Sequence, residues 1–171
     1  LELLKSFNAR AVFFVVGSRI TNAPHVLRRI IDEGHLIGNH SFHHYQNQRN
    51  FFDFLNDLKK CQDLIYANSG KWAPVFRPPG GRISINSLII PKMLHLRTVL
   101  WSLDGDDWNL RTEHSSQQIA KDLIEQLKER DILLLHDNNA KALHILELLL
   151  PAIASLKINM HDAVDVFERH R

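Results

Sequence analysis

The sequence has 171 residues, 44% of them hydrophobic, which is enough for one globular domain with a sizeable core. Its 21 lysines and arginines stand against 19 acids, so the formal net charge of +2 gives no field strong enough to argue for nucleic-acid binding. No apolar stretch reaches the roughly 18 residues of a membrane-spanning helix. Cys61 is alone, which excludes a disulfide within these residues. We expect a single domain over residues 1–171, in a compartment that composition leaves open.

The first half of the chain alternates between strand and helix patterns. Residues 10–16 form a mostly apolar run before a glycine, which predicts a strand covered on both faces. Residues 24–33 predict a helix, because they begin with proline and a glycine follows them. A short apolar run, Leu36–Ile37, comes next. Residues 51–69 repeat apolar side chains at helical spacing and predict a long amphipathic helix.

The second half continues the same alternation. Strand patterns occupy three runs, residues 75–76, 97–103 and 131–135. Helix patterns occupy two runs, residues 115–127, which open with a capping-box sequence, and residues 142–150, which Pro151 should end. This alternation favours a parallel α/β sheet or barrel. Because a complete eightfold barrel usually takes about 250 residues, we predict an irregular or incomplete (β/α) barrel.

Four groups of polar side chains directly follow predicted strands. These groups are residues 38–44, 77–81, 104–108 and 136–137. In barrels of this kind the chemistry lies on the loops at the carboxyl ends of the strands. We therefore expect all four groups to lie on one rim, and this shared placement is stronger evidence than any single motif.

The segment GNHSFHH, residues 38–44, contains three histidines. Histidines four residues apart on a helical turn project from the same face, which selects His40 and His44 as a pair for one metal ion, whereas His43 would point elsewhere. Imidazole nitrogen suits Zn2+, but two histidines are an incomplete site that a carboxylate and water would have to complete. The alternative is a set of polar loop histidines.

Three other positions carry candidate chemistry. Arg77 precedes two prolines and two glycines, a rigid turn that can hold a guanidinium beside exposed backbone N–H groups, although a solvated arginine on a surface turn is as compatible with the pattern. Asp107 and Trp108 end an acidic loop that could orient a base or an imidazolium, or could simply be solvated. His136 ends an apolar strand, where it could donate a proton to a leaving group or serve as a cap.

Taken in order from about Arg10 to Phe167, these motifs resemble the NodB-homology polysaccharide deacetylases, carbohydrate esterase family four. Residues 11–17 are similar to the family's ATFFVVG strand, and residues 34–44 resemble its GHEIGNHTxxH motif. That resemblance implies His40 and His44 as metal ligands, in agreement with the spacing. Residues 76–81 resemble FRPPYG, whose arginine, by this resemblance Arg77, orients the catalytic base.

The remaining motifs of the resemblance assign further roles. The backbone N–H after the second proline of FRPPYG helps bind the oxyanion; in this sequence that residue is Gly80 in place of the usual Tyr. The DW motif implies that Asp107 supports the histidine acid and that Trp108 lines the acetyl pocket. The ILLHD motif implies that Leu134 lines the same pocket and that His136 is the catalytic acid.

One departure from the family pattern concerns its first motif. The family begins with a strand ending in TFDDG, whose first Asp is the catalytic base and whose second is a metal ligand, and no such stretch occurs in these residues. Either the sequence as printed lacks that leading segment, or the protein has lost the base. We expect the 171 residues alone to have weak metal affinity and little deacetylase activity.

The resemblance implies metal-dependent hydrolysis, most simply with Zn2+, of N-acetyl groups on an N-acetylglucosamine-containing polysaccharide such as peptidoglycan or chitin. It implies a place outside the cytoplasm or at the cell envelope. The charge and the lack of a long apolar stretch predict no nucleic-acid partner and no transmembrane segment. A second hypothesis is a non-catalytic carbohydrate-binding or structural domain with the same fold. A third is an unrelated zinc hydrolase, whose third ligand would come from four other histidines, His35, His43, His114 or His161.

Overall fold

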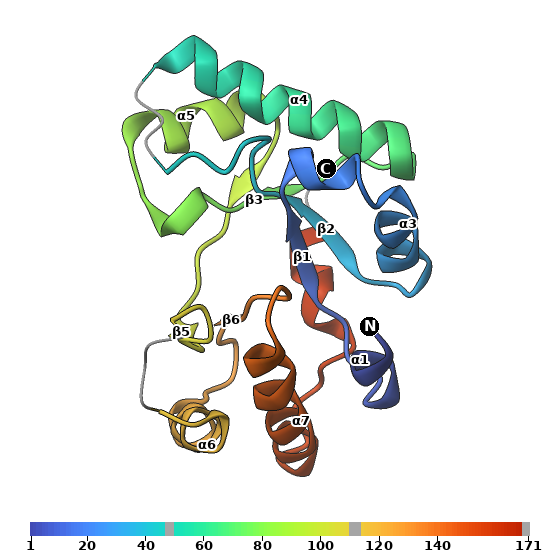
Figure 1. Ribbon diagram of the computed structural model, residues 1–171, viewed down its shortest axis with the longest axis vertical. Helices are drawn as coiled ribbons and strands as arrows, with labels where there is room; N and C mark the ends of the chain where they lie inside the picture. The colour runs from blue at the N-terminus through green and yellow to red at the C-terminus, as the bar shows by residue number, and fades with distance from the viewer. Residues whose placement is uncertain (47–49, 110–113, 169–171) are drawn as a thin grey trace. The chain divides into compact units, whose positions relative to one another are not determined.

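The computed structural model describes residues 1–46, 50–109 and 114–168 (Figure 1). They divide into two compact units. The first unit contains Leu1, residues 10–100 and the residues from His161 onward, and the second contains Glu2–Ala9 and Trp101–Met160. Among the described residues, no helix is both long enough and apolar enough to span a membrane.

The first unit is built on a parallel sheet of four strands in the order β1-β2-β3-β4 (Figure 1). Its elements are β1 Val12–Val15, α2 Gly17–Ile20, α3 Pro24–Asp32, β2 Leu36–Asn39, α4 Phe51–Ser69, β3 Val75–Phe76, the 3-10 turn η1 Pro79–Gly81, α5 Ile85–Met93, β4 Arg97–Thr98, the 3-10 turn η2 Asp162–Val164 and α8 Asp165–Glu168. The parallel register sets Asn39 beside Phe76 and Phe76 beside Thr98. Consecutive strands therefore deliver their following loops to one edge of the sheet.

Helix α4 supplies much of the core of the first unit. The Asn50 side chain caps its start by accepting hydrogen bonds from two backbone amides, and Gly70 ends it in the left-handed conformation with φ of 71°. Phe54, Leu58 and Ile65 on its apolar face are each at most 1% exposed. This face packs on β2 and on α2, α3 and α5. The predicted helix over residues 51–69 is confirmed at both ends.

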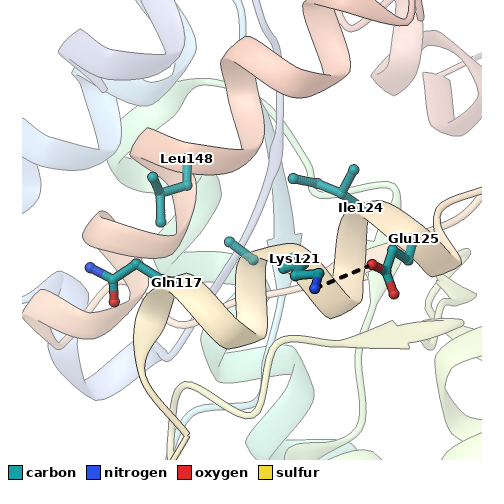
Figure 2. Close-up of a pocket in the computed structure, with 6 residues that line it drawn as sticks. Gln117, Lys121, Ile124, Glu125 and Leu148 are labelled. Atoms are coloured by element: carbon teal, nitrogen blue, oxygen red, sulfur yellow. Dashed lines mark ion pairs between the residues drawn. The ribbon is translucent and has the colours of Figure 1, made fainter.

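The second unit has a two-stranded parallel sheet and a pair of packed helices. Its elements are α1 Glu2–Ser6, β5 Leu103–Asp104, α6 Ser116–Gln126, β6 Leu133–Leu134 and α7 Ala140–Ser155. Ile119 and Leu123 of α6 pack with Ile145 and Leu149 of α7. Beside this core lies a pocket of about 340 Å3. Figure 2 shows side chains that line it, among them Gln117 of α6. None of the residues that line this pocket is a candidate site residue.

The predicted strand over residues 97–103 is wrong as one element. Its first part, β4, pairs in the sheet of the first unit, and its last part, β5, pairs with β6 in the second unit. The chain leaves the first sheet because two carbonyls between these strands, those of Val99 and Leu100, accept hydrogen bonds from the Arg77 guanidinium at 3.3 and 3.0 Å.

Helix α7 also differs from the prediction, because it continues through Pro151 to Ser155. Proline removes one backbone donor and crowds the preceding turn, which usually ends or kinks a helix. In α7, Leu149 and Leu150 are buried before the proline, and Ile153 packs on the same core beyond it. Apolar packing on both sides of Pro151 therefore offsets the lost hydrogen bond. Among the described residues, the α/β class with parallel strands is confirmed.

Candidate active site

His40 directly follows β2, and its backbone N–H donates to the carbonyl of Val15 at 3.0 Å. Its ring Nδ1 lies 2.7 Å from the carbonyl oxygen of Arg77. Since a carbonyl only accepts, Nδ1 carries the proton in this contact and the neutral ring keeps its lone pair on Nε2. Metal-binding histidines are commonly oriented by a hydrogen bond from the ring nitrogen that does not bind the metal.

His44 approaches His40 through a loop, so the helical turn expected over residues 40–44 is wrong. Ser41 and His44 have positive φ angles of 64° and 61°, which reverse the chain within a few residues. The N–H of His44 donates to the Ser41 hydroxyl at 3.0 Å. The ring centroids of His40 and His44 lie 4.8 Å apart, a separation compatible with two imidazoles on one ion at Zn–N distances of about 2.0–2.1 Å.

Asn39 holds this loop in place, and sequence reasoning did not single it out. Its side chain is fully buried; the amide donates to the Leu58 carbonyl at 3.0 Å and to Gln62 Oε1 at 3.2 Å, and Oδ1 accepts from Ser41 N–H at 2.8 Å. A buried amide bonded on both sides fixes the strand end against α4. The sequence shows an asparagine before His40, but it does not show the hydrogen-bond partners of this asparagine on α4.

Arg77 follows β3 and is buried, with only 7% of its surface exposed. Burial lowers the pKa of its guanidinium to about 10, so it remains a cation at neutral pH. It lies over the Phe14 ring, with Cζ 4.1 Å from the ring centroid. Gly80 lies in η1 with φ of 60° and is exposed. The first unit thus brings His40, His44 and Arg77 together, and places Gly80 three residues beyond Arg77.

The donor set for a metal is incomplete within the described residues, which hold no group of three or more histidine, cysteine, aspartate or glutamate side chains placed for one ion. Two imidazoles fit part of a Zn2+ site. Three of the four histidines considered as an additional ligand have other contacts: His35 Nδ1 accepts from the N–H of Ala11, His43 pairs with Asp57 and His161 pairs with Asp162. His40 and His44 therefore remain the candidate metal ligands, and a complete site needs further ligands.

The second unit brings Asp107 and His136 together at the carboxyl ends of β5 and β6. Asp107 is fully buried, and its Oδ1 lies 3.0 Å from His136 Nδ1. Oδ2 accepts from the backbone N–H of His136 at 2.9 Å and from Asn139 Nδ2 at 3.1 Å. Asn139 also caps α7 by accepting from the N–H of Ala142. A helix cap two residues after the HD pair was the available sequence signal for Asn139, which the sequence analysis missed.

These contacts shift both groups toward their charged forms. Burial acts to raise the pKa of the Asp107 carboxyl, but the hydrogen bonds from His136 and Asn139 outweigh it, so this pKa lies below its ordinary value. The hydrogen bond to Asp107 raises the pKa of His136, against the opposing effect of burial, and the charges of Asp104 and Asp137 add to the rise. A histidine held in this way is suited to donate a proton near neutral pH.

Two further residues were predicted to line an acetyl pocket. Leu134 in β6 is buried, at 8% exposure, and its carbonyl accepts from the N–H of Gly105 at 3.0 Å. Trp108 follows Asp107 in the chain and is 59% exposed. Both residues lie in the second unit with His136, and their roles stay predictions.

The two units share one arrangement: histidines and charged side chains follow parallel strands at their carboxyl ends. This arrangement defines an α/β protein of the kind that carries its chemistry on strand-end loops. The polysaccharide deacetylase family profile matches residues 1–99, more than half of the chain. The chain belongs to this family, which confirms the resemblance to NodB-homology deacetylases and contradicts the hypothesis of an unrelated zinc hydrolase.

Individual relatives agree with this assignment. The chain is 34% identical to the peptidoglycan-N-acetylmuramic acid deacetylase PdaA of Bacillus subtilis over 84% of its own length and 56% of the relative. Among solved structures, peptidoglycan deacetylase PdaC of Bacillus subtilis superposes with a TM-score of 0.85 at 24% identity, covering 98% of this chain and 82% of that one. A family-four pseudoenzyme of Bacillus anthracis, BA3943, has a TM-score of 0.79 at 24% identity, covering 91% and 53%.

These comparisons also confirm the fold class. Because the structural neighbours are family-four deacetylases, the prediction of an incomplete barrel of the deacetylase type is confirmed. The chain spans just over half the length of PdaA. The extent of the domain, predicted as residues 1–171, stays a prediction.

Proposed function

We propose that this chain forms part of a metal-dependent N-deacetylase that hydrolyses N-acetyl groups on a peptidoglycan-like polysaccharide. Family membership and the activity for which PdaA is named support the reaction class. The N-acetylglucosamine unit expected from the sequence and the N-acetylmuramic acid named for PdaA are both sugars of peptidoglycan. We favour Zn2+ as the metal because imidazole ligands suit it.

The observation that carries the proposal is the oriented pair of His40 and His44. The Arg77 carbonyl holds the His40 proton on Nδ1, and the centroids of the two rings lie 4.8 Å apart with their planes at 69°. These two side chains would hold the ion, together with a carboxylate of the kind that the family's first motif supplies. When bound, Zn2+ polarises an acyl carbonyl and lowers the pKa of water.

The chain's own groups have separate tasks in this hydrolysis. The backbone N–H of Gly80 donates to the oxyanion as charge develops on the acetyl oxygen. Asp107 accepts from His136 Nδ1, which keeps the other ring nitrogen, Nε2, as the proton donor to the departing amine. The Arg77 cation orients the carboxylate base, Trp108 and Leu134 line the acetyl pocket, and the sugar amine leaves with the proton from His136.

A second candidate function is a non-catalytic carbohydrate-binding domain. The structural likeness to BA3943, described as a pseudoenzyme, favours keeping it, because the fold alone does not determine activity. The two functions differ in one measurement: the enzyme releases acetate from the polysaccharide, whereas the binding domain holds the polysaccharide without acetate release.

The decisive experiment uses the protein as its gene encodes it, with zinc content and acetate release measured on the same samples. His136→Ala should lower acetate release by about 100-fold or more, the usual contribution of a general acid, and leave zinc content unchanged. His44→Ala should remove the zinc. Two exposed histidines provide controls, since His144→Ala of α7 and His25→Ala of α3 should change neither quantity.

Three outcomes would contradict the proposal or part of it. Zinc loss in His136→Ala would make the acid assignment wrong. Unchanged metal content in His44→Ala would remove the metal role of the histidine pair. Saccharide binding by a wild-type protein that releases no acetate would favour the non-catalytic candidate.

A further inference from the structure

In the first unit, the end of the Gln46 side chain lies directly beside Gly80. A Cβ atom built on Gly80 would lie 3.0 Å from Gln46 Nε2 and 3.1 Å from its Cδ, so the end of the Gln46 side chain stands where a side chain at position 80 would begin. Both residues are exposed. The carboxamide, which comes from another loop, therefore lies where the side chain of the family's usual tyrosine would begin.

The backbone at Gly80 is fixed by the turn that contains it. Gly80 has φ of 60°, a left-handed conformation that favours glycine. The following N–H groups, of Gly81 and Arg82, donate to the carbonyls of Pro78 and Pro79. A rigid turn without a side chain leaves its surface open to whatever lies above it, and that neighbour is Gln46.

The loop that carries Gln46 is held from α4 by Asp57. Its Oδ2 accepts from the N–H of Phe42 at 2.9 Å, and its Oδ1 lies 2.5 Å from His43 Nδ1. The His43 ring in turn stacks on Tyr45, with centroids 5.0 Å apart and planes at 9°. Gln46 is the next residue, so its carboxamide extends from a loop that a carboxylate and two stacked rings hold in place. The same loop carries His44.

We propose that Gln46 is a specificity-determining residue that hydrogen-bonds the saccharide beside its reacting acetamido group. The inference rests on the proposed deacetylase function, because Gly80 and His44 are candidates for binding the acetyl oxygen and the metal. Gln46 lies beside Gly80 and is two residues from His44 in the sequence. A carboxamide both donates and accepts hydrogen bonds, so it matches the hydroxyl and acetamido groups of a neutral sugar. A tyrosine wall at position 80 would instead present an aromatic face.

The first test measures the affinity of the chain for a β-1,4-linked N-acetylglucosamine tetramer by calorimetry. Gln46→Ala should weaken binding about 3–10-fold, the usual effect of losing one neutral hydrogen bond. The matched control is Gln117→Ala, another exposed glutamine, on α6 (Figure 2), which should leave the affinity unchanged. Equal affinities for wild type and Gln46→Ala, or no binding by wild type, would overturn the inference.

The second test is a double-mutant cycle between positions 46 and 80. Gly80→Ala should weaken tetramer binding because its new Cβ displaces the carboxamide of Gln46. In the Gln46→Ala background the same change should cost much less. The backbone strain of alanine at a positive φ is common to both backgrounds and cancels in the cycle. Equal effects of Gly80→Ala in the two backgrounds would show that the two positions do not share this role.

A third measurement separates this inference from the proposed function. In the protein as its gene encodes it, Gln46→Ala should raise KM for the tetramer about 3–10-fold with a smaller change in kcat. A structural role of Gln46 would instead lower the amount of folded protein without this split. Tetramer binding that depends on Gln46 without any acetate release would contradict the proposed function and leave only the hydrogen bond between Gln46 and the saccharide standing.

Discussion

Asp107→Asn tests the proton-donor pair most directly, because it keeps the size of the side chain and removes its charge. Asp107 is fully buried and accepts three hydrogen bonds, one at Oδ1 and two at Oδ2. Asparagine retains one acceptor oxygen. The asparagine amide is better placed with its oxygen at the position of Oδ2, where it keeps both contacts, from the backbone N–H of His136 and from Asn139. Its NH2 group then faces His136 Nδ1.

The magnitude follows from this one changed contact. A hydrogen bond to a charged group contributes about 1.5–3 kcal/mol and a neutral one about 0.5–1.5 kcal/mol, so Asp107→Asn should lower the free energy of unfolding by about 1–2 kcal/mol. His136 avoids the clash by moving its proton from Nδ1 to Nε2, the tautomer change that impairs histidine in other acid–base sites. The pKa of His136 should also fall, because the hydrogen bond and the charge of Asp107 that raise it are gone.

Urea unfolding and an NMR titration of the His136 ring measure both effects on the 171-residue chain. Asp104→Asn is the matched control: Asp104 also raises the pKa of His136, but only through its charge, and is itself exposed. It should shift the titration less than Asp107→Asn does. An unchanged His136 titration in Asp107→Asn would refute the reasoning that this carboxylate holds the imidazolium.

The pair also predicts a pH dependence of stability. The pKa of Asp107 is lowered, so its contribution is present above the unfolded value near 3.9 and is lost as the pH falls through the folded value. The pKa of His136 is raised, so its contribution is present below about 6.5 and is lost as the pH rises through the folded value. The joint contribution should be largest between these limits and should flatten in Asp107→Asn.

Three further predictions concern stability, each measured by urea unfolding. Burial lowers the pKa of His35, so below about pH 6.5 the unfolded chain binds more protons than the folded chain, and stability should decrease as the pH decreases. His35→Gln should remove this contribution to the pH dependence, and His25→Gln should not. Asn39→Ala should cost roughly 3 kcal/mol, because it removes three buried hydrogen bonds, and a change below about 0.5 kcal/mol would contradict its anchoring role. Gly105→Ala should cost about 1–3 kcal/mol, since its Cβ would lie 2.3 Å from Leu135 Cδ2 and 3.0 Å from the Leu134 carbonyl; wild-type stability would refute the close approach.

Local sequence patterns predicted the elements whose apolar faces and ends are marked by their own residues. Helix α4 matches its predicted bounds because its apolar spacing and terminal glycine agree with its packing. The run over residues 97–103 failed because hydropathy does not reveal that the Arg77 side chain takes the Val99 and Leu100 carbonyls. Pro151 failed as a stop because apolar contacts on both sides of it decide the outcome.

The candidate site was predictable to a similar degree. The positions of His40, Arg77, Asp107 and His136 after strands follow from the alternation of strands and helices. In the structure, His40 and Arg77 directly follow their strands, and Asp107 and His136 lie in the loops after β5 and β6. The side chains that orient them were not predictable, because their contacts join residues far apart in sequence: Asn139 reaches back 32 residues to Asp107. The contacts that orient the site residues depend on how the helices are capped and packed. The periodicity of apolar residues in the sequence does not encode them.

The parallel register explains why each pair of site residues meets. Asn39 is paired with Phe76, so the next residue of each strand, His40 and Arg77, emerges at the same level and forms the 2.7 Å contact between Nδ1 and the Arg77 carbonyl. In the second unit Asp104 is paired with Leu134, and the loops that follow bring Asp107 to His136. Because side chains alternate along a strand, a one-residue slip would turn these side chains to the opposite face. The number of residues between strand end and functional side chain is therefore a structural constraint, and inserting one residue after Asn39 should separate His40 from the Arg77 carbonyl even where the fold survives.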